Sequence, residues 1–340
     1  MCPSITLEID QMIITPQELQ NWVSKGRSFV AADIRPDEQR HHFPINGLEA
    51  ITATAENLPP RKKKPLILIC QFGVLTEELI IEQNLRNAYS LLGGVQSWEA
   101  FQTDKMDLSR WSRQTILTEI GMAGQRKLQD SKITIVGMGG LGCPAAQTLA
   151  ASGVGNLQLI DGDLIELSNL HRQPLYNIND IGQAKVSVAR KSLQNLNEKL
   201  TVIAKEIHLD ESNAQELLKD TDLIIDATDN MKTRQVIDRT SKAENIPMVY
   251  GGLYRFEGQV AVLNHDGSPG YEDIFTAAPT GGDTCAEAGV LGMLPAIIGN
   301  IQALEAVKII IGIKPDLSGK LLLYDGITHE TNVINIGGKA

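Results

Sequence analysis

The residues best suited to chemistry begin at a glycine-rich turn before the middle of the chain. Gly137, Gly139 and Gly142 follow a predicted strand in the spacing G-x-G-x-x-G, and Gly140 lies among them. Such glycines let backbone N–H groups approach a phosphate and let the next helix pack closely on the strand. Asp161, nineteen residues beyond Gly142, ends the next predicted strand, where a carboxylate suits a ribose diol. The pattern predicts a nucleotide site, and by itself it fits NAD as well as ATP.

Polar side chains after this second strand favour ATP over NAD. They are Asp163, Asn169, Arg172, Gln173 and Lys185. A dehydrogenase that reads a neutral nicotinamide has little use for two cations here. A triphosphate does need them, because negative charge develops on the departing pyrophosphate oxygens. The alternative, that Arg172 and Lys185 lie on a solvated face, loses weight because both follow a nucleotide-type strand end.

A further predicted strand ends in a second polar group, within the segment "DLIIDATDN" from Asp222 to Asn230. Open α/β sheets bind their ligands outside the carboxyl ends of the strands. Asp229 lies beyond this strand, so we expect it to hold a Mg²⁺ ion that bridges phosphates, with Asn230 beside it at the nucleotide. Asp226 could equally be a capping residue.

Seven motifs carry a resemblance to a known family. They are "RWSRQ", "GMGGLG", "IDGDLIELSNLHRQ", "GQAKV", "DATDN", "EGQ" and "TCAEAGVLG". Together, and in the expected order between Leu108 and Ile336, they resemble the MoeB/ThiF/HesA family, the bacterial relatives of ubiquitin-activating enzymes. The resemblance implies ATP-dependent adenylation of the C-terminal Gly-Gly carboxylate of a small ubiquitin-fold sulfur carrier protein, with release of pyrophosphate.

The resemblance also implies roles for individual residues. Asp161 and Asn169 are expected to hold the ribose and the nearby nucleotide. Arg172 and Lys185 are expected to grip the phosphates, and Asp229 the magnesium. No general base is required, because a carboxylate is already an anion at neutral pH.

Two further residues have roles that depend on the resemblance. Arg113, in "RWSRQ", corresponds to the family's arginine that reaches into the partner subunit's phosphate site, which implies a symmetric homodimer. Cys285 follows the turn-forming stretch "AAPTGGDT". In relatives, a cysteine at this place forms a thioester or acyl disulfide with the carrier, whereas others keep it without a catalytic need. Both readings stay open for Cys285.

The sequence departs from the family in its zinc site. Many members bind a structural zinc through two C-x-x-C pairs. Gly270 and Asp273 stand where the first pair belongs, and the final segment "NVINIGGKA" has no second pair. Four thiolates cannot be assembled from the four scattered cysteines, so we predict no zinc. How this region is stabilised instead is left open.

The elements that must position these groups alternate strand and helix. A helix that runs to about Asp130 leads into the first strand, and the helix "CPAAQTLAASG" stops at Gly153. The segment "PMVYGGLYRFEGQVAVLNHDG" reads as a parallel strand followed by a hairpin. We therefore expect a Rossmann-like, doubly wound and mainly parallel sheet with an antiparallel extension.

The first hundred residues also read as an α/β domain. "FVAADI" and "LILIC" are apolar runs typical of buried parallel strands, and helical patterns appear in "TPQELQNWV" and "LTEELIIEQNLRNAY". The segments "AADIRPDEQRHHFPINGLEAI" and "LLGGVQSWEAF", with Cys70 at a strand-to-helix turn, resemble a rhodanese-like sulfurtransferase domain. The resemblance makes Cys70 a candidate sulfur-carrying residue. Val74 and Leu75 replace the arginine common in such loops, which leaves open a degenerate domain with a buried cysteine or one that only recruits partners.

The polar segment from Thr103 to Ser109 is predicted as the linker. The predicted domains are a rhodanese-like domain at 1–104 and an adenylyltransferase domain at 105–340.

Composition narrows the partners and the compartment. The chain has 340 residues and a net charge of −10, which argues against nucleic acid as the main partner. No apolar run approaches the ~20 residues of a membrane span, and the start of the chain lacks the pattern of a signal peptide, so we expect a cytoplasmic protein without a membrane partner. The carrier, the source of sulfur and the pathway, molybdopterin, thiamin or another, stay open. A modifier-activating role outside cofactor synthesis and an NAD-dependent oxidoreductase are the alternatives.

Overall fold

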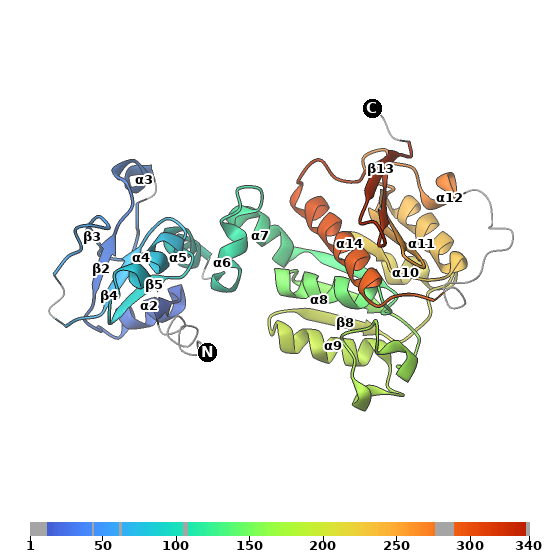
Figure 1. Ribbon diagram of the computed structural model, residues 1–340, viewed down its shortest axis with the longest axis horizontal. Coiled ribbons are helices and arrows are strands. Elements are labelled where there is room, and N and C mark those ends of the chain that lie inside the picture. The colour runs from blue at the N-terminus through green and yellow to red at the C-terminus, as the bar shows by residue number, and fades with distance from the viewer. Residues whose placement is uncertain (1–11, 43, 61–62, 105–107, 276–288, 338–340) are drawn as a thin grey trace. The chain divides into compact units, whose positions relative to one another are not determined.

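The computed structural model describes residues 12–42, 44–60, 63–104, 108–275 and 289–337 (Figure 1). The chain forms two compact units, Met1–Gln125 and Arg126–Ala340. Both are built from strands and helices, as predicted for an α/β protein. The predicted domain boundary between residues 104 and 105 stays a prediction.

Unit 1 holds a five-stranded parallel sheet in the order β1-β5-β4-β2-β3. Its strands are β1 (Ile13–Ile14), β2 (Val30–Asp33), β3 (Ile51–Thr52), β4 (Leu66–Ile69) and β5 (Ala88–Leu91). Its helices are α2 (Pro16–Ser24), α3 (Asp37–His42), α4 (Val74–Glu82), α5 (Gly94–Asp104), η2 (Ser109–Trp111) and α6 (Ser112–Thr115). Every residue of β4 is buried, as expected for a central parallel strand.

Local signals explain where the helices of unit 1 begin and end. Thr15 caps α2, because its hydroxyl accepts a hydrogen bond from the Glu18 N–H at 3.1 Å. The prediction of one helical pattern from Leu75 to Tyr89 is wrong at its end, because α4 stops at Glu82 and β5 begins at Ala88. Asn84 and Asn87 lie between the two elements with φ of 48° and 54°, left-handed values that asparagine tolerates and that a continuing helix does not allow.

Unit 2 is built on an eight-stranded sheet in the order β13-β12-β11-β10-β9-β6-β7-β8. The strands are β6 (Lys132–Val136), β7 (Asn156–Ile160), β8 (Thr201–Lys205), β9 (Leu223–Asp226), β10 (Met248–Tyr254), β11 (Glu257–Leu263), β12 (Lys320–Asp325) and β13 (Thr331–Asn335). Pairing is parallel from β8 to β10 and antiparallel from β10 to β13. The predicted parallel sheet with an antiparallel extension is therefore confirmed.

Strand order places the expected ligand crevice. The chain runs outward from β6 through β7 to β8, then returns to the other side of β6 as β9. The carboxyl ends of β6 and β9 therefore flank the point where the order reverses, which is where open α/β sheets bind ligands.

Helices complete unit 2 (Figure 1). They are α7 (Gly121–Asp130, which starts in unit 1), α8 (Gly142–Ser152), α9 (Lys185–Leu196), α10 (Ala214–Leu218), α11 (Met231–Glu244), α12 (Tyr271–Ile274) and α14 (Met293–Ile311), with the short turns η3 (Leu167–Asn169) and η4 (Ile178–Asp180). Helix α14 packs against α8 and against β9, β10 and β11. Helices α10 and α11 contribute to a separate core cluster with β6, β7, β9 and β10.

One helix of the described residues, α14, is long and apolar enough to cross a membrane. The expectation that no apolar run approaches this length is therefore too strong. Half of its most apolar window is buried inside the protein. Its contacts with α8 and the sheet are those of a core helix.

Candidate nucleotide-binding site

The glycine turn joins β6 to α8 and needs glycine for steric reasons. Gly137 has φ of +94°, and a Cβ there would lie 2.6 Å from the Ala227 carbonyl oxygen. A Cβ on Gly142 would lie 2.0 Å from the Gly137 oxygen. These two glycines thus let the turn fold tightly between the ends of β6 and β9.

Gly139 and Gly140 face the residues predicted to grip the nucleotide. A Cβ on Gly139 would have only the Gln173 Nε2 within 4 Å, at 3.8 Å. A Cβ on Gly140 would approach Pro295 at 3.0 Å and the Arg172 Cδ at 3.5 Å. The structure therefore brings Arg172 and Gln173 to the glycine turn, although they lie 32 and 34 residues beyond Gly140 and Gly139 in the sequence.

Asp161 ties the end of β7 to the same turn. Its Oδ2 accepts a hydrogen bond from the Met138 N–H at 2.6 Å, and its Oδ1 accepts one from the Asp163 N–H at 2.8 Å. Burial raises the pKa of the Asp161 carboxyl, and the positive charge of Lys185 lowers it by a smaller amount. A partly buried acceptor thus lies beside the glycine turn, where the sequence predicts the ribose.

Lys185, the first residue of α9, points at the end of the same strand. Its Nζ lies 2.7 Å from the Asp163 Oδ2, and its side chain is only 8% exposed. Its backbone N–H donates to the Asp163 carbonyl at 3.1 Å. The predicted phosphate-binding ammonium is therefore fixed near Asp163 and largely screened from bulk water.

Asn169, Arg172 and Gln173 share one turn that starts in η3. The N–H groups of Arg172 and Gln173 donate to the Asn169 carbonyl at 3.0 and 3.1 Å. The Arg172 Nη1 donates to the Ser168 carbonyl at 2.9 Å, and its side chain is half-buried. Gln173 is 2% exposed, and its Oε1 has no hydrogen-bond partner within the described ranges. A buried, unpaired oxygen beside a glycine turn is a polar group that a ligand would satisfy.

Not every predicted contact points toward a ligand. The Asn169 Oδ1 accepts a hydrogen bond from the Glu166 N–H at 3.0 Å, so this side chain shapes its own turn. The Asn230 Oδ1 accepts one from the Thr233 N–H at 2.9 Å and caps α11. We missed the capping role of Asn230, although an asparagine before a helical pattern is a standard signal.

Asp229 lies in the short loop between β9 and α11, and it is exposed. The loop touches the glycine turn, because the Ala227 oxygen lies where a Cβ of Gly137 would clash. Carboxylate oxygens are preferred ligands of Mg²⁺, which keeps several waters and the phosphates in its coordination shell. An exposed carboxylate next to a phosphate-type turn fits that requirement.

Sequence reasoning missed Arg234, a largely buried arginine behind this loop. Its Nε lies 2.9 Å from the Oδ2 of Asp226, whose side chain is fully buried. A signal was present: an aspartate at the end of a buried strand requires a partner, and an arginine follows in the next helix.

The predicted sulfur site in unit 1 is built around a buried cysteine. Cys70 follows β4, and its Sγ accepts a hydrogen bond from the Gly73 N–H at 3.1 Å. The hydroxyl of Thr76 lies 3.7 Å from the same sulfur. Arg35, held by Asp33 at 2.8 and 2.9 Å, reaches the loop at the Gln71 Oε1, at 3.2 Å. A cation thus approaches the loop through Gln71.

The remaining predicted residues fall elsewhere. Arg113 forms an ion pair with Glu77 of α4, and its side chain is 60% exposed. Cys285 lies outside the described residues. Cys143 is fully buried in α8, its Sγ donates to the Met138 carbonyl at 3.4 Å, and burial raises its pKa to about 12. Cys143 is therefore a core residue of α8.

The segment at Gly270 and Asp273, where the resemblance places the family's first cysteine pair, is held by hydrogen bonds and an ion pair. The Gly270 N–H donates to the Asp273 Oδ2 at 2.9 Å, and the Lys242 Nζ lies 3.0 Å from the same oxygen. Buried Asp238 accepts from the N–H groups of Tyr271 and Glu272 at 2.7 and 3.0 Å. These contacts fix α12 to α11.

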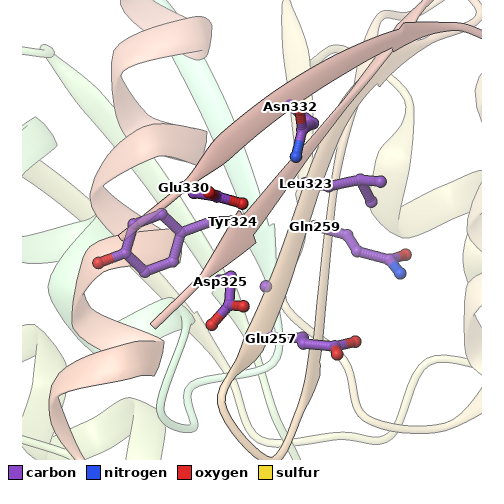
Figure 2. A pocket seen from close by; sticks show the side chains of 8 residues that line it. Glu257, Gln259, Leu323, Tyr324, Asp325, Glu330 and Asn332 are labelled. Carbon is purple, nitrogen blue, oxygen red and sulfur yellow. The ribbon is translucent and has the colours of Figure 1, made fainter. Parts of the chain in front are cut away.

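A pocket opens on the antiparallel part of the sheet (Figure 2). Residues of β11, β12, β13 and the turn before β13 line it, and most of them are polar: Glu257, Gly258, Gln259, Leu323, Tyr324, Asp325, Glu330 and Asn332. None of these residues belongs to the predicted nucleotide set, and three carboxylates make the pocket unsuited to phosphates.

The fold and the site together define a Rossmann-like nucleotide-binding protein. The ThiF family model matches residues 111–340. The chain belongs to the ThiF family, as the resemblance predicted.

Named relatives agree with this assignment. The sulfur carrier protein adenylyltransferase of Thermus thermophilus is 43% identical over 230 residues, which cover 66% of this chain and 85% of that protein. The adenylyltransferase and sulfurtransferase MOCS3 of Xenopus laevis is 41% identical over 235 residues, 68% of this chain and 52% of that protein. The chain thus matches about half the length of MOCS3. These names confirm the predicted adenylyltransferase class.

Solved structures support the fold. The crystal structure of PaaA has a TM-score of 0.60 and 29% identity, covering 68% of this chain and 83% of that one. Escherichia coli MccB, solved with ATP, has a TM-score of 0.59 and 22% identity over 68% of this chain and 72% of that one.

Proposed function

We propose that the protein uses ATP to adenylate the C-terminal carboxylate of a ubiquitin-like sulfur carrier protein that ends in Gly-Gly. The observation that carries the proposal is the approach of Arg172 and Gln173 to the glycine turn, together with the buried ammonium of Lys185 beside Asp163. Cations at this place suit a triphosphate whose leaving group is pyrophosphate. Relatives named for sulfur carriers, molybdopterin synthase and the SAMP modifier support the class of substrate.

In this proposal the chain catalyses by positioning and charge neutralisation. The carrier carboxylate attacks the α-phosphorus of ATP, the bond to the β-phosphate oxygen breaks, and pyrophosphate leaves. Asp161 holds the ribose, while Arg172 and Lys185 meet the phosphates. Bound at Asp229, Mg²⁺ would supply further neutralisation of the phosphate charge.

We also propose a cytoplasmic homodimer. Several large apolar side chains of unit 2 are more than half exposed and are available for contact with a second subunit or a carrier: Leu164, Leu167, Ile178, Met293 and Ile327. Arg113, now paired with Glu77, would exchange that partner for phosphates in the second subunit.

Unit 1 is proposed as the sulfur donor. A persulfide on Cys70 would attack the acyl-adenylate carbonyl and displace AMP, which leaves the carrier joined to Cys70 as an acyl disulfide; a cellular thiol would then reduce the disulfide and release the thiocarboxylate. The second candidate is a unit that only recruits partners, because Cys70 is buried and Val74 and Leu75 replace the loop arginine. Rhodanese activity with thiosulfate separates the two.

The test is exchange of labelled pyrophosphate into ATP with and without a Gly-Gly carrier. We expect exchange only with the carrier, and its loss in Arg172→Ala and Asp229→Ala. Cys70→Ser should retain exchange and lose sulfur transfer. Full exchange in either of the first two variants, or tighter binding of NAD than of Mg²⁺–ATP, would refute the assignment.

A further inference from the structure

A buried arginine lies directly behind the loop that carries Asp229. The side chain of Arg234, on the second turn of α11, is 13% exposed. Its Nε donates to the Asp226 Oδ2 at 2.9 Å, and its Nη2 donates to the Thr228 carbonyl at 2.6 Å. The Nη2 also lies 3.2 Å from the Gly251 carbonyl of β10. One guanidinium therefore joins β9, the loop after it and β10.

The same loop is fixed from two other directions. The Asp226 Oδ1 accepts hydrogen bonds from the N–H and the hydroxyl of Thr228, at 3.0 and 2.6 Å. The Gln302 Nε2 of α14 donates to the Asp226 carbonyl of β9 at 2.7 Å and to the Val249 carbonyl of β10 at 3.1 Å. The backbone up to Thr228 is thus held on every side, and Asp229 is the next residue.

Aromatic rings set the orientation of the guanidinium. The Arg234 Cζ lies 4.8 Å from the centre of the Tyr250 ring and 5.5 Å from that of Tyr271. Burial opposes the charged form of the guanidinium, yet the negative charge of Asp226 raises the pKa of Arg234, so Arg234 stays charged. Relative to apolar side chains, a buried ion pair adds little net stability to a fold. Stabilisation of the fold alone therefore does not account for the Arg234–Asp226 pair.

We propose that Arg234 is a positioning residue that fixes the Asp226–Asp229 loop so that the Asp229 carboxylate meets the magnesium of ATP. Arg234 itself touches neither the metal nor the nucleotide. The inference rests on the metal role proposed above for Asp229. Groups that orient a metal ligand from behind commonly alter metal affinity about 10- to 100-fold when they are replaced.

The test compares Arg234→Lys with Arg239→Lys in the full-length chain. Lysine keeps the charge at 234 but cannot reach both Asp226 and the Thr228 carbonyl, because it lacks the planar fork. Arg239 lies on the same helix, is half-exposed, and pairs with Glu211 and Glu272. Calorimetric titration gives the dissociation constant of ATP in the presence of Mg²⁺ and, separately, in the presence of EDTA. We define the magnesium advantage as the dissociation constant in EDTA divided by that in Mg²⁺.

We expect Arg234→Lys to reduce the magnesium advantage about tenfold, while binding of metal-free ATP stays within about twofold. Arg239→Lys should change neither value. A lower melting temperature for Arg234→Lys with an unchanged magnesium advantage would assign Arg234 a structural role only and overturn the inference. If Arg234→Lys does not fold, Thr228→Val, which removes the hydroxyl donor to Asp226, should show a smaller loss in the same direction, and no loss there overturns the inference.

Asp229→Asn separates this inference from the proposed function. Loss of the magnesium advantage in Asp229→Asn, but not in Arg234→Lys, overturns the positioning role alone. An unchanged advantage in Asp229→Asn overturns the metal role of Asp229 and the positioning role with it.

Discussion

Replacing Lys185 by methionine tests the phosphate site most directly. Methionine preserves most of the buried aliphatic volume and removes the ammonium that lies 2.7 Å from the Asp163 carboxylate. If Lys185 neutralises charge on the departing pyrophosphate, its loss removes about 3–4 kcal/mol of transition-state stabilisation, which slows adenylation about 10²- to 10³-fold. The Asp163 side chain is 53% exposed and can be rehydrated, so the free energy of unfolding should change by about 1 kcal/mol or less.

The assay is carrier-dependent pyrophosphate exchange over a range of ATP concentrations, together with urea unfolding. Lys191→Met is the matched control, because Lys191 is exposed on the same helix. The control should retain the parent rate. A loss of less than about threefold in kcat/KM for Lys185→Met, with Lys191→Met unchanged, would refute a role for Lys185 at the phosphates.

Three further predictions test the surroundings of the site. Gly142→Ala should lower the free energy of unfolding by about 1–3 kcal/mol, because a Cβ would lie 2.0 Å from the Gly137 oxygen; an unchanged urea midpoint would contradict this. Cys143, with a pKa of about 12, should resist iodoacetamide at pH 8 in the native protein and react in guanidinium, as mass spectrometry can show; rapid native labelling would argue against the buried site. The pKa of Asp161 in the folded chain is raised above its ordinary value of 3.8, so the folded chain binds this proton more tightly than the unfolded chain does. As the pH falls from the native pKa toward 3.8, the contribution of Asp161 to the free energy of unfolding therefore grows. Protonation removes a ribose acceptor, so ATP affinity should fall over the same window, and a flat titration across it would contradict this reasoning.

The sequence predicted those parts of the site that depend on local geometry. The need for glycine at 142 reflects a contact within one strand–turn–helix unit, where a Cβ would meet the Gly137 oxygen, so the local pattern identifies the turn. The predicted hairpin of β10 and β11 is equally local, and it is confirmed. The error at the end of α4 was also local. The apolar residues continue the helical pattern beyond Glu82, but two asparagines in the left-handed region prevent the helix from continuing.

The parts that could not be predicted depend on contacts between distant segments. The place of Arg234 is defined by Asp226 and Thr228 on one side and by Gly251 and two tyrosines on the other. No spacing in the sequence encodes that arrangement. The unpaired oxygen of Gln173 is similar, because its burial arises only when its turn folds over Gly139.

The contacts at Gly270 and Asp273, where the resemblance places the first cysteine pair, have a physical consequence for the candidate site. The Gly270 N–H donates a hydrogen bond to the Asp273 carboxylate, and the Asp238 carboxylate accepts hydrogen bonds from two backbone N–H groups at the start of α12. Tyr271 of that helix packs against Tyr250 at 5.5 Å between ring centres and lies over Arg234. The contacts that fix α12 thus continue into the guanidinium behind the Asp229 loop. Hydrogen bonds accepted by one buried carboxylate thus hold this segment and connect it to the candidate nucleotide site.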